Sequence, residues 1–175
     1  MSMNRSSGSA SPPRSRGLLA CVLLLGLSGC MTEDKSDRPA PQPPPPETPA
    51  SSMVLSFTPT EDSDGNGWLD TTYATVYLFS DRFAAPLDVE GTFRFELTDS
   101  QGRPLARWDF SIDEAAQQRF IGPPGVGRAF RLALTEPGQD ELPVRAANMT
   151  CTFQPASGGP GLRKTIQGLM FGRAR

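Results

Sequence analysis

The stretch VEGTFRFELTDSQGRPLARWDF, residues 89–110, carries the pattern that decides the fold. In its first half the apolar residues Phe93, Phe95 and Leu97 alternate with polar ones, and the final ARWDF repeats this alternation. A period of two puts apolar side chains on one face of a β-strand and polar side chains on the other. The residues between the halves, 99–102, are Asp-Ser-Gln-Gly, which favour a tight turn. The stretch therefore predicts an antiparallel β-hairpin with one buried face.

Five further runs have the composition of strands. Two alternate like the first hairpin and three are rich in β-branched and aromatic residues: RAFRLALT, NMTCTFQP, MVLSFTP, TYATVYLFS and KTIQGLMFG. Segments rich in Gly and Pro separate the runs and are typical of turns; IGPPGVGR at 121–128 is one of them. The one helical candidate is DEAAQQRF, residues 113–120. We therefore expect residues 52–175 to form an all-β domain, an antiparallel β-sandwich of about seven strands.

Residues 1–29 have the three parts of a secretory leader. Arg5, Arg14 and Arg16 precede an uncharged run at residues 17–27, and small residues follow that run. The run is too short to cross a bilayer, which takes roughly 20 apolar residues. The pattern predicts a signal peptide that is removed from the mature protein.

The four residues Leu27-Ser28-Gly29-Cys30, at the end of this leader, resemble the lipobox of bacterial lipoproteins. The resemblance implies that Cys30 becomes the first residue and receives a diacylglyceryl thioether. Several acyl chains hold a protein stably on a membrane without a transmembrane helix. Met31 is not the aspartate that retains such lipoproteins at the inner membrane of many Gram-negative bacteria, so the resemblance implies the outer membrane. The expected lipid partner is therefore the membrane, reached through Cys30, with the domain outside the cytoplasm.

Residues 30–51, which follow the leader, are rich in proline and contain no aromatic residue. Proline favours the extended polyproline II conformation and interrupts both helices and sheet ladders, so we expect a disordered tether. Removal of residues 1–29 would take three basic residues and no acidic ones from totals of 17 and 19, leaving 14 basic, 19 acidic and a net charge of −5. This balance gives no general attraction to nucleic acid, and we expect no nucleic-acid partner.

The sequence contains no histidine. This excludes histidine-based zinc and copper sites, histidine general bases and Ser-His-Asp triads. Of the three cysteines, Cys21 would leave with the leader and Cys30 would carry lipid, so Cys151 would be alone. We therefore expect neither a disulfide nor a thiolate metal cluster. The position of Cys151 on the apolar face of NMTCTFQP favours a buried, inert thiol.

The loop EDSDGNGWLD, residues 61–70, is the candidate cation site. Its candidate ligands all offer oxygen atoms: the side chains of Asp62, Asp64, Asn66 and Asp70, and the carbonyl of Trp68. Their spacing follows the first nine positions of an EF-hand loop, but position twelve is a tyrosine and not the bidentate glutamate. The stretch resembles the D-x-D-x-N-G-x-x-D calcium loops of several extracellular bacterial modules. Since Asp, Asn and Gly also favour loops without ions, two interpretations stay open: a calcium ion that pins the loop, and a simple connection.

Three motifs together resemble bacterial lipoproteins that have no assigned activity and carry one Ig-like or transthyretin-like β-sandwich after a low-complexity linker. The motifs are the lipobox at 27–30, the loop at 62–70 and the hairpin at 89–110. The resemblance implies a location in the bacterial cell envelope and a sandwich fold, and it implies no activity.

We therefore expect a membrane-anchored envelope lipoprotein whose sandwich is a non-catalytic binding or structural module. Its expected partner is an envelope protein or a polysaccharide. We expect no enzyme, because no spacing selects a pair of carboxylates and no serine lies in the context of a nucleophile elbow. Two alternatives stay open: a carbohydrate-active or other hydrolytic enzyme that uses a carboxylate pair, and a calcium-dependent adhesion module.

Overall fold

The computed structural model describes residues 44–173. The predicted signal peptide, the predicted acylation site Cys30 and most of the predicted tether lie outside the described residues.

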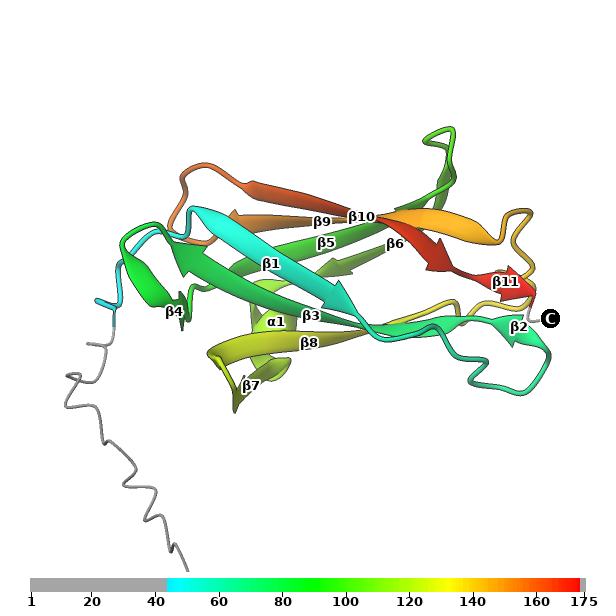
Figure 1. Ribbon diagram of the computed structural model, residues 1–175, viewed down its shortest axis with the longest axis horizontal. Helices are drawn as coiled ribbons and strands as arrows, with labels where there is room; N and C mark the ends of the chain where they lie inside the picture. Colours follow the sequence, from blue (N-terminus) through cyan, green and yellow to red (C-terminus); the bar gives the residue numbers. More distant parts are fainter. Residues whose placement is uncertain (1–43, 174–175) are drawn as a thin grey trace, which may run out of the picture. The chain divides into compact units, whose positions relative to one another are not determined.

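Two antiparallel sheets form the domain (Figure 1). In the first sheet the order is β1 (Ser52–Phe57), β3 (Thr71–Ser80), β8 (Gly125–Ala133) and β7 (Arg119–Gly122), and β4 (Phe83–Leu87) pairs with the end of β3. In the second sheet the order is β10 (Leu162–Met170), β9 (Ala146–Pro155), β5 (Gly91–Thr98) and β6 (Pro104–Phe110). A two-stranded ribbon of β2 (Trp68–Leu69) and β11 (Gly172–Arg173) lies at one end. This arrangement confirms the predicted all-β sandwich.

The strand order is that of immunoglobulin-type sandwiches. Such domains have the order A-B-E-D in one sheet and G-F-C in the other, and some add a strand C′ beside strand C. The observed orders, β1-β3-β8-β7 and β10-β9-β5-β6, reproduce both when the strands are lettered along the chain with β2, β4 and β11 left out and β6 taken as C′. Antibody domains link strands B and F by a disulfide, whereas here Cys151 on β9 is buried and free. The described sandwich is therefore held by packing across its core.

Phenylalanine rings fill the middle of this core. Phe130 of the first sheet lies 5.0 Å from Phe93 and 5.1 Å from Phe95 of the second sheet, measured between ring centroids. Phe153 of β9 packs on Phe93 at 4.8 Å. All four side chains are at most 1% exposed. The alternation in β5 therefore has the physical consequence that the sequence predicts, since both phenylalanines of the GTFRF motif join the two sheets.

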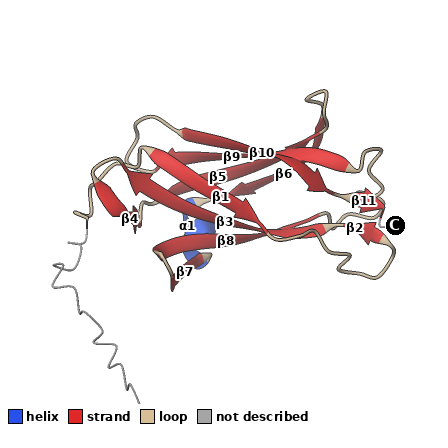
Figure 2. Ribbon diagram, viewed as in Figure 1, coloured by secondary structure: helices blue, strands red, loops and turns tan. Residues whose placement is uncertain are grey.

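All seven predicted strands are present, and the structure adds four short ones: β2, β4, β7 and β11. The helical prediction over 113–120 is right in kind but wrong at its end. Helix α1 spans Ile112–Gln117, and residues 119–120 belong to β7 (Figure 2). Ser111 and Glu114 form a reciprocal capping box that sets the start of the helix. The predicted turn in IGPPGVGR is confirmed as the connection of the β7–β8 hairpin.

The chain enters the sandwich along residues 44–51, which the sequence places in the tether. Ala50 is buried, and the backbone N–H of Ser51 donates a hydrogen bond to the carbonyl of Phe79. The end of the expected tether therefore lies on the domain. Within residues 44–173, no helix has the length and apolar character that crossing a membrane requires.

Candidate functional site

The loop between β1 and β2 begins and ends on a pair of backbone contacts. The N–H of Glu61 donates to the carbonyl of Thr71, and the N–H of Asp70 donates to the carbonyl of Glu61. These contacts close the loop at its base and hold Asp70, which is 3% exposed, at the start of β3. The loop is therefore pinned to the first sheet at both ends.

Asp62 organises the interior of this loop. Its carboxylate accepts the backbone N–H groups of Gly65 at 2.8 Å, Asn66 at 3.1 Å and Gly67 at 2.7 Å. Gly67 has a φ of 89°, a conformation that side chains other than glycine rarely adopt. The hydrogen bond from Gly67 is the main reason that the pKa of Asp62 lies below its ordinary value. Asp62 is therefore a carboxylate at neutral pH.

Three carboxylates converge in the loop. One oxygen each of Asp62, Asp64 and Asp70 lies within 4.8 Å of the others. A Ca²⁺ ion binds oxygens at about 2.3–2.6 Å, so two of its ligands can be at most about 5 Å apart. The three side chains thus have a ligand type and a separation compatible with a calcium ion, and their ligand role stays a prediction.

Asn66 lies in the same loop, and its side-chain amide directs the nitrogen, not the oxygen, toward Asp64. Its nitrogen donates to Asp64 at 3.0 Å and to Asp140 at 2.8 Å, while its oxygen accepts the N–H of Trp68 at 2.8 Å. An ion in the cluster would take the Asn66 oxygen only after this amide turned over. Trp68 itself is in β2, where it pairs with Arg173 of β11. The structure thus brings Asp62, Asp64 and Asp70 together and gives Asn66 a hydrogen-bonding role.

Asp140 is a residue of this site that the sequence did not indicate. It is 7% exposed and is joined to the loop by the Asn66 amide, although 74 residues separate the two. No local pattern marks it, because its neighbours Glu136–Gly138 look like an ordinary turn. A fourth carboxylate increases the negative charge beside the loop, which favours a cation there.

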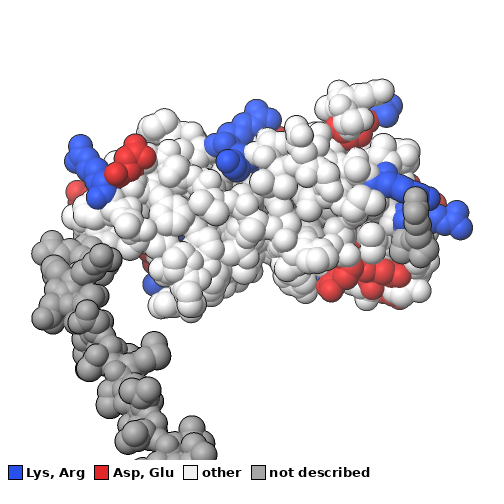
Figure 3. Space-filling model, viewed as in Figure 1, with Lys and Arg blue, Asp and Glu red and all other residues white. Residues whose placement is uncertain are grey.

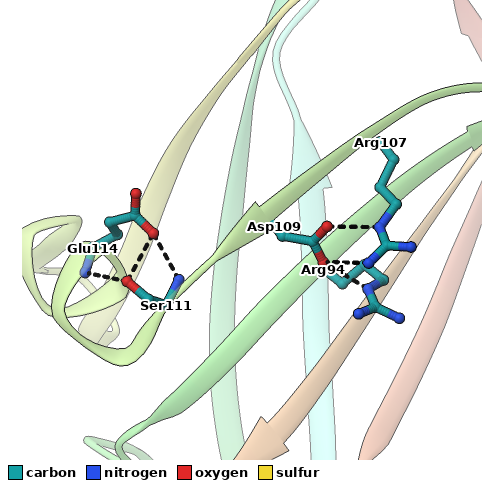
Figure 4. A network of polar contacts seen from close by, with 5 residues as sticks. All are labelled: Arg94, Arg107, Asp109, Ser111 and Glu114. Carbon is teal, nitrogen blue, oxygen red and sulfur yellow. Dashed lines mark hydrogen bonds and ion pairs between the residues drawn. The ribbon is translucent and has the colours of Figure 1, made fainter.

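A second group of titratable side chains lies on the outer face of β5 and β6, next to α1 (Figure 4). Asp109 accepts the Nε–H of Arg94 at 2.7 Å and the Nε–H of Arg107 at 2.6 Å. Glu114 accepts the backbone N–H of Ser111 at 2.8 Å and its hydroxyl at 2.7 Å. The five residues line a shallow hollow of about 680 Å³. If the domain were an enzyme of the carboxylate-pair type, Asp109 and Glu114 would be the candidate carboxylates in this hollow.

The electrostatics of the hollow do not suit acid catalysis. The hydrogen bond from Arg107, aided by Arg94, lowers the pKa of Asp109. The backbone N–H of Ser111 lowers the pKa of Glu114. A glycosidase needs one carboxyl whose pKa is raised so that it carries a proton near neutral pH. Both carboxyls here are held as carboxylates.

The outer faces of the two sheets differ in charge. The second sheet has five charged side chains on its outer face: Arg94, Glu96, Arg107, Asp109 and Arg163. The outward residues of β1, β3, β7 and β8 include one charged residue, Arg131; the uncharged ones include Ser52, Val54, Ser56, Tyr73, Thr75, Tyr77, Phe79, Phe120, Gly127 and Ala129. We call this second set the neutral face. Figure 3 shows a broad surface over β1 and β3 without charged atoms, and acidic atoms gathered toward the end of the domain that carries β2.

A row of apolar side chains crosses the neutral face. Val54 is the register partner of Tyr77, and the ring of Phe120 meets the ring of Tyr77 edge to face at 5.8 Å. Gly127 lies beneath them, where a Cβ atom would lie 2.7 Å from the ring of Tyr77 and 2.9 Å from that of Phe120. The glycine therefore lets the two rings lie against the sheet.

The sequence matches no protein-family model and no curated protein.

Proposed function

We propose that the protein is a lipid-anchored, non-catalytic module of the bacterial envelope that binds a partner through the neutral face. The observation that carries the proposal is the contrast between the two sheets. The solvent-facing side of an antiparallel sheet is usually polar, and the outer face of the second sheet follows this rule with its five charged residues. A face with exposed Val54 and Tyr73 and one charge is the kind of surface that marks an interaction site.

The chemistry of the neutral face indicates the class of partner. Aromatic rings and hydroxyl groups without charge suit an envelope protein or an uncharged polysaccharide, since both offer apolar patches and neutral hydrogen-bonding groups. The anchor at Cys30 would keep the domain close to such partners. Lipidation and the outer-membrane location are part of this proposal; the resemblance of residues 27–30 to a lipobox supports lipidation, and Met31 supports the outer membrane.

Two matched substitutions test the binding face. Thr75→Glu puts a charge in the middle of the neutral face, and Thr152→Glu puts the same charge on the outer face of the second sheet. Both threonines are half-buried on outward positions, so the effects on folding should be similar. The lipidated protein is solubilised from membranes, and its co-purifying proteins and its binding to envelope polysaccharide are measured.

We expect Thr75→Glu to abolish the binding of a specific partner that the unchanged protein and Thr152→Glu both bind. Equal binding by all three proteins would contradict the assignment of the neutral face. Hydrolysis of a glycan or peptide by the purified protein would contradict the non-catalytic role and favour the enzyme alternative, with Asp109 and Glu114 as the first residues to replace.

Calcium-dependent adhesion is a second candidate function, and the convergence of Asp62, Asp64 and Asp70 favours it. A site of this extracellular type would bind calcium weakly, with a Kd on the order of 10⁻⁴–10⁻³ M. We expect 10 mM-scale calcium to raise Tm and a chelator to reverse the rise, because an ion that binds only the folded state stabilises it by mass action. Asp64→Asn should remove the response, whereas Asp113→Asn on α1 should keep it. If the Tm of the unsubstituted protein is the same with excess calcium and with chelator, a calcium role for the loop is excluded.

A further inference from the structure

The hairpin between β7 and β8 ends in an uncharged apolar tip. Residues 120–127 read FIGPPGVG, eight residues without a charged or hydrogen-bonding side chain. Ile121 is 75% exposed, more than the exposed Val54, Tyr73, Ile112 and Met170. We call residues 120–126 the apolar tip. Ile121, Pro123 and Pro124 are all exposed and form one contiguous apolar surface, and such surfaces are a feature of interaction sites.

The apolar tip is held firmly by its neighbours. The hydroxyl of Tyr77 donates a hydrogen bond to the carbonyl of Pro123 at 3.3 Å, and its ring packs on Phe120. Gly125 lies so close to Pro86 that a Cβ atom there would be 3.0 Å from the proline Cδ. These contacts restrict the tip, which lowers the entropy that ordering it for a contact would cost.

The apolar tip lies at the end of the domain where the chain enters. Val126 shares a hollow of about 390 Å³ with Pro44, Pro45 and Pro86. In Figure 1 the β7–β8 turn and the first described residues are at the same end, opposite β2 and β11. Residues 31–43 separate Pro44 from Cys30, and a fully extended chain of that length reaches at most about 50 Å. Pro44, which lies beside the tip, would therefore be within about 50 Å of a lipid-anchored Cys30.

The charges beside the apolar tip are paired. Asp88 accepts the Nε–H of Arg119 at 2.7 Å and an N–H of Arg128 at 3.1 Å. A neutral tip with a phenylalanine and a nearby tyrosine matches the interface of a bilayer, where aromatic and aliphatic side chains lie at the level of the headgroups.

We propose that the apolar tip inserts into the surface of the membrane to which Cys30 is anchored, and so fixes the orientation of the domain on that membrane. The inference rests on the proposed lipid anchor. A single exposed tip binds lipid weakly by itself, but the anchor makes its contact intramolecular and raises its effective concentration. Because the tip is uncharged, insertion should not require anionic lipid and should change little with salt.

The test uses a fluorophore on an introduced cysteine. Gly122→Cys places it in the tip, where a Cβ atom would meet only the Phe120 ring at an ordinary 3.5 Å. Met170→Cys is the matched control, since Met170 is 50% exposed and ends β10 at the opposite end of the sandwich (Figure 1). Cys151 is buried and stays unlabelled. The lipidated full chain is reconstituted in phosphatidylcholine vesicles that contain a nitroxide lipid at headgroup depth.

We expect the nitroxide to quench the label at 122 at least about threefold more strongly than the label at 170. Adding Ile121→Asp should reduce insertion by about tenfold or more, since burial of an isoleucine contributes at least that factor. No quenching at 122 while the protein floats with the vesicles would overturn the inference and leave the anchor standing. Equal quenching at both positions would also overturn it. If the fluorescence of the label at 122 changes with protein concentration in the absence of vesicles, the tip contacts a second copy of the chain, and the inference is overturned. Protein that fails to float would overturn anchor and insertion together.

Discussion

Arg128 presents the most demanding electrostatic arrangement in the core, and its partner Asp88 gives a sharp prediction. The Arg128 side chain is 5% exposed and lies over the ring of Phe93, 5.7 Å from its centroid. One guanidinium nitrogen donates to Asp88 at 3.1 Å, while Nε is buried without a partner. Burial lowers the pKa of Arg128, and the charge of Asp88 opposes this. Asp88 is 41% exposed and also pairs with Arg119.

These contacts predict that removal of the half-exposed Asp88 lowers the free energy of unfolding more than removal of the buried Arg128. Asp88→Ala would leave a buried guanidinium unpaired, which costs about 3–5 kcal/mol for a fully buried pair and about 2–3 kcal/mol here, because Asp88 is half-exposed. Arg128→Met keeps most of the buried aliphatic volume and leaves Asp88 with Arg119. It loses a cation–π contact of about 0.5–2 kcal/mol and removes an unsatisfied donor that costs about 1–3 kcal/mol. We therefore expect a change within about 1 kcal/mol.

Urea unfolding measures both values. With an m-value of about 1–3 kcal/mol/M, Asp88→Ala should lower the midpoint by about 1 M and Arg128→Met should leave it nearly unchanged. The double variant should be more stable than Asp88→Ala alone, because it has no buried charge to leave unpaired. If Arg128→Met proves more destabilising than Asp88→Ala, the reasoning about desolvation is refuted.

Three further predictions concern the second sheet. Gly91→Ala would drive a Cβ atom into the carbonyl oxygen of Gln154 and the adjacent ring, and we expect a loss of about 2–3 kcal/mol by urea unfolding; an unchanged midpoint would refute the close packing of β5 on β9. Burial raises the pKa of Cys151 to about 12, so the native protein should not react with a thiol reagent at pH 8, whereas the unfolded protein should react fully; rapid native labelling would contradict its burial. Burial raises the pKa of Asp99, but the backbone N–H and the guanidinium of Arg103 outweigh this, so the pKa lies below its ordinary value. The ionised carboxylate therefore stabilises the fold fully above the unfolded pKa, and this stabilisation is lost as pH falls through the lower folded pKa. Asp99→Asn should therefore weaken the acid-induced loss of stability below about pH 4, and an identical acid titration would exclude this role.

The long strands could be predicted because their burial follows the sequence period. In β5 the residues Phe93, Phe95 and Leu97 are all at most 1% exposed, and each is separated by a polar residue. The short strands have no such period. β4 contains Pro86, which argues against a strand, and β2 has two residues. β4 forms because the long strand β3 provides backbone partners, and β2 forms because it meets β11 from the other end of the domain sequence; no local pattern records either pairing.

In the helix and in the acidic loop, too, local sequence signals could be predicted, whereas features that depend on tertiary contacts could not. The S-x-x-E spacing of Ser111 and Glu114 is a local signal and would have placed the start of α1 correctly. Its end depends on the pairing of Arg119 with Arg128 in β7 and β8, a tertiary contact. In the loop, the spacing of the aspartates is local and could be predicted, whereas the proximity of Asp140 arises only from the fold.

The intact mass of the protein extracted from membranes decides whether Cys30 carries a lipid. If Cys30 anchors the domain in the envelope, the intact mass must correspond to a chain that begins at residue 30 and carries a diacylglyceryl group on its thiol. A mass that includes residues 1–29 with an unmodified Cys30 would contradict the anchor, the envelope location and the function proposed from them.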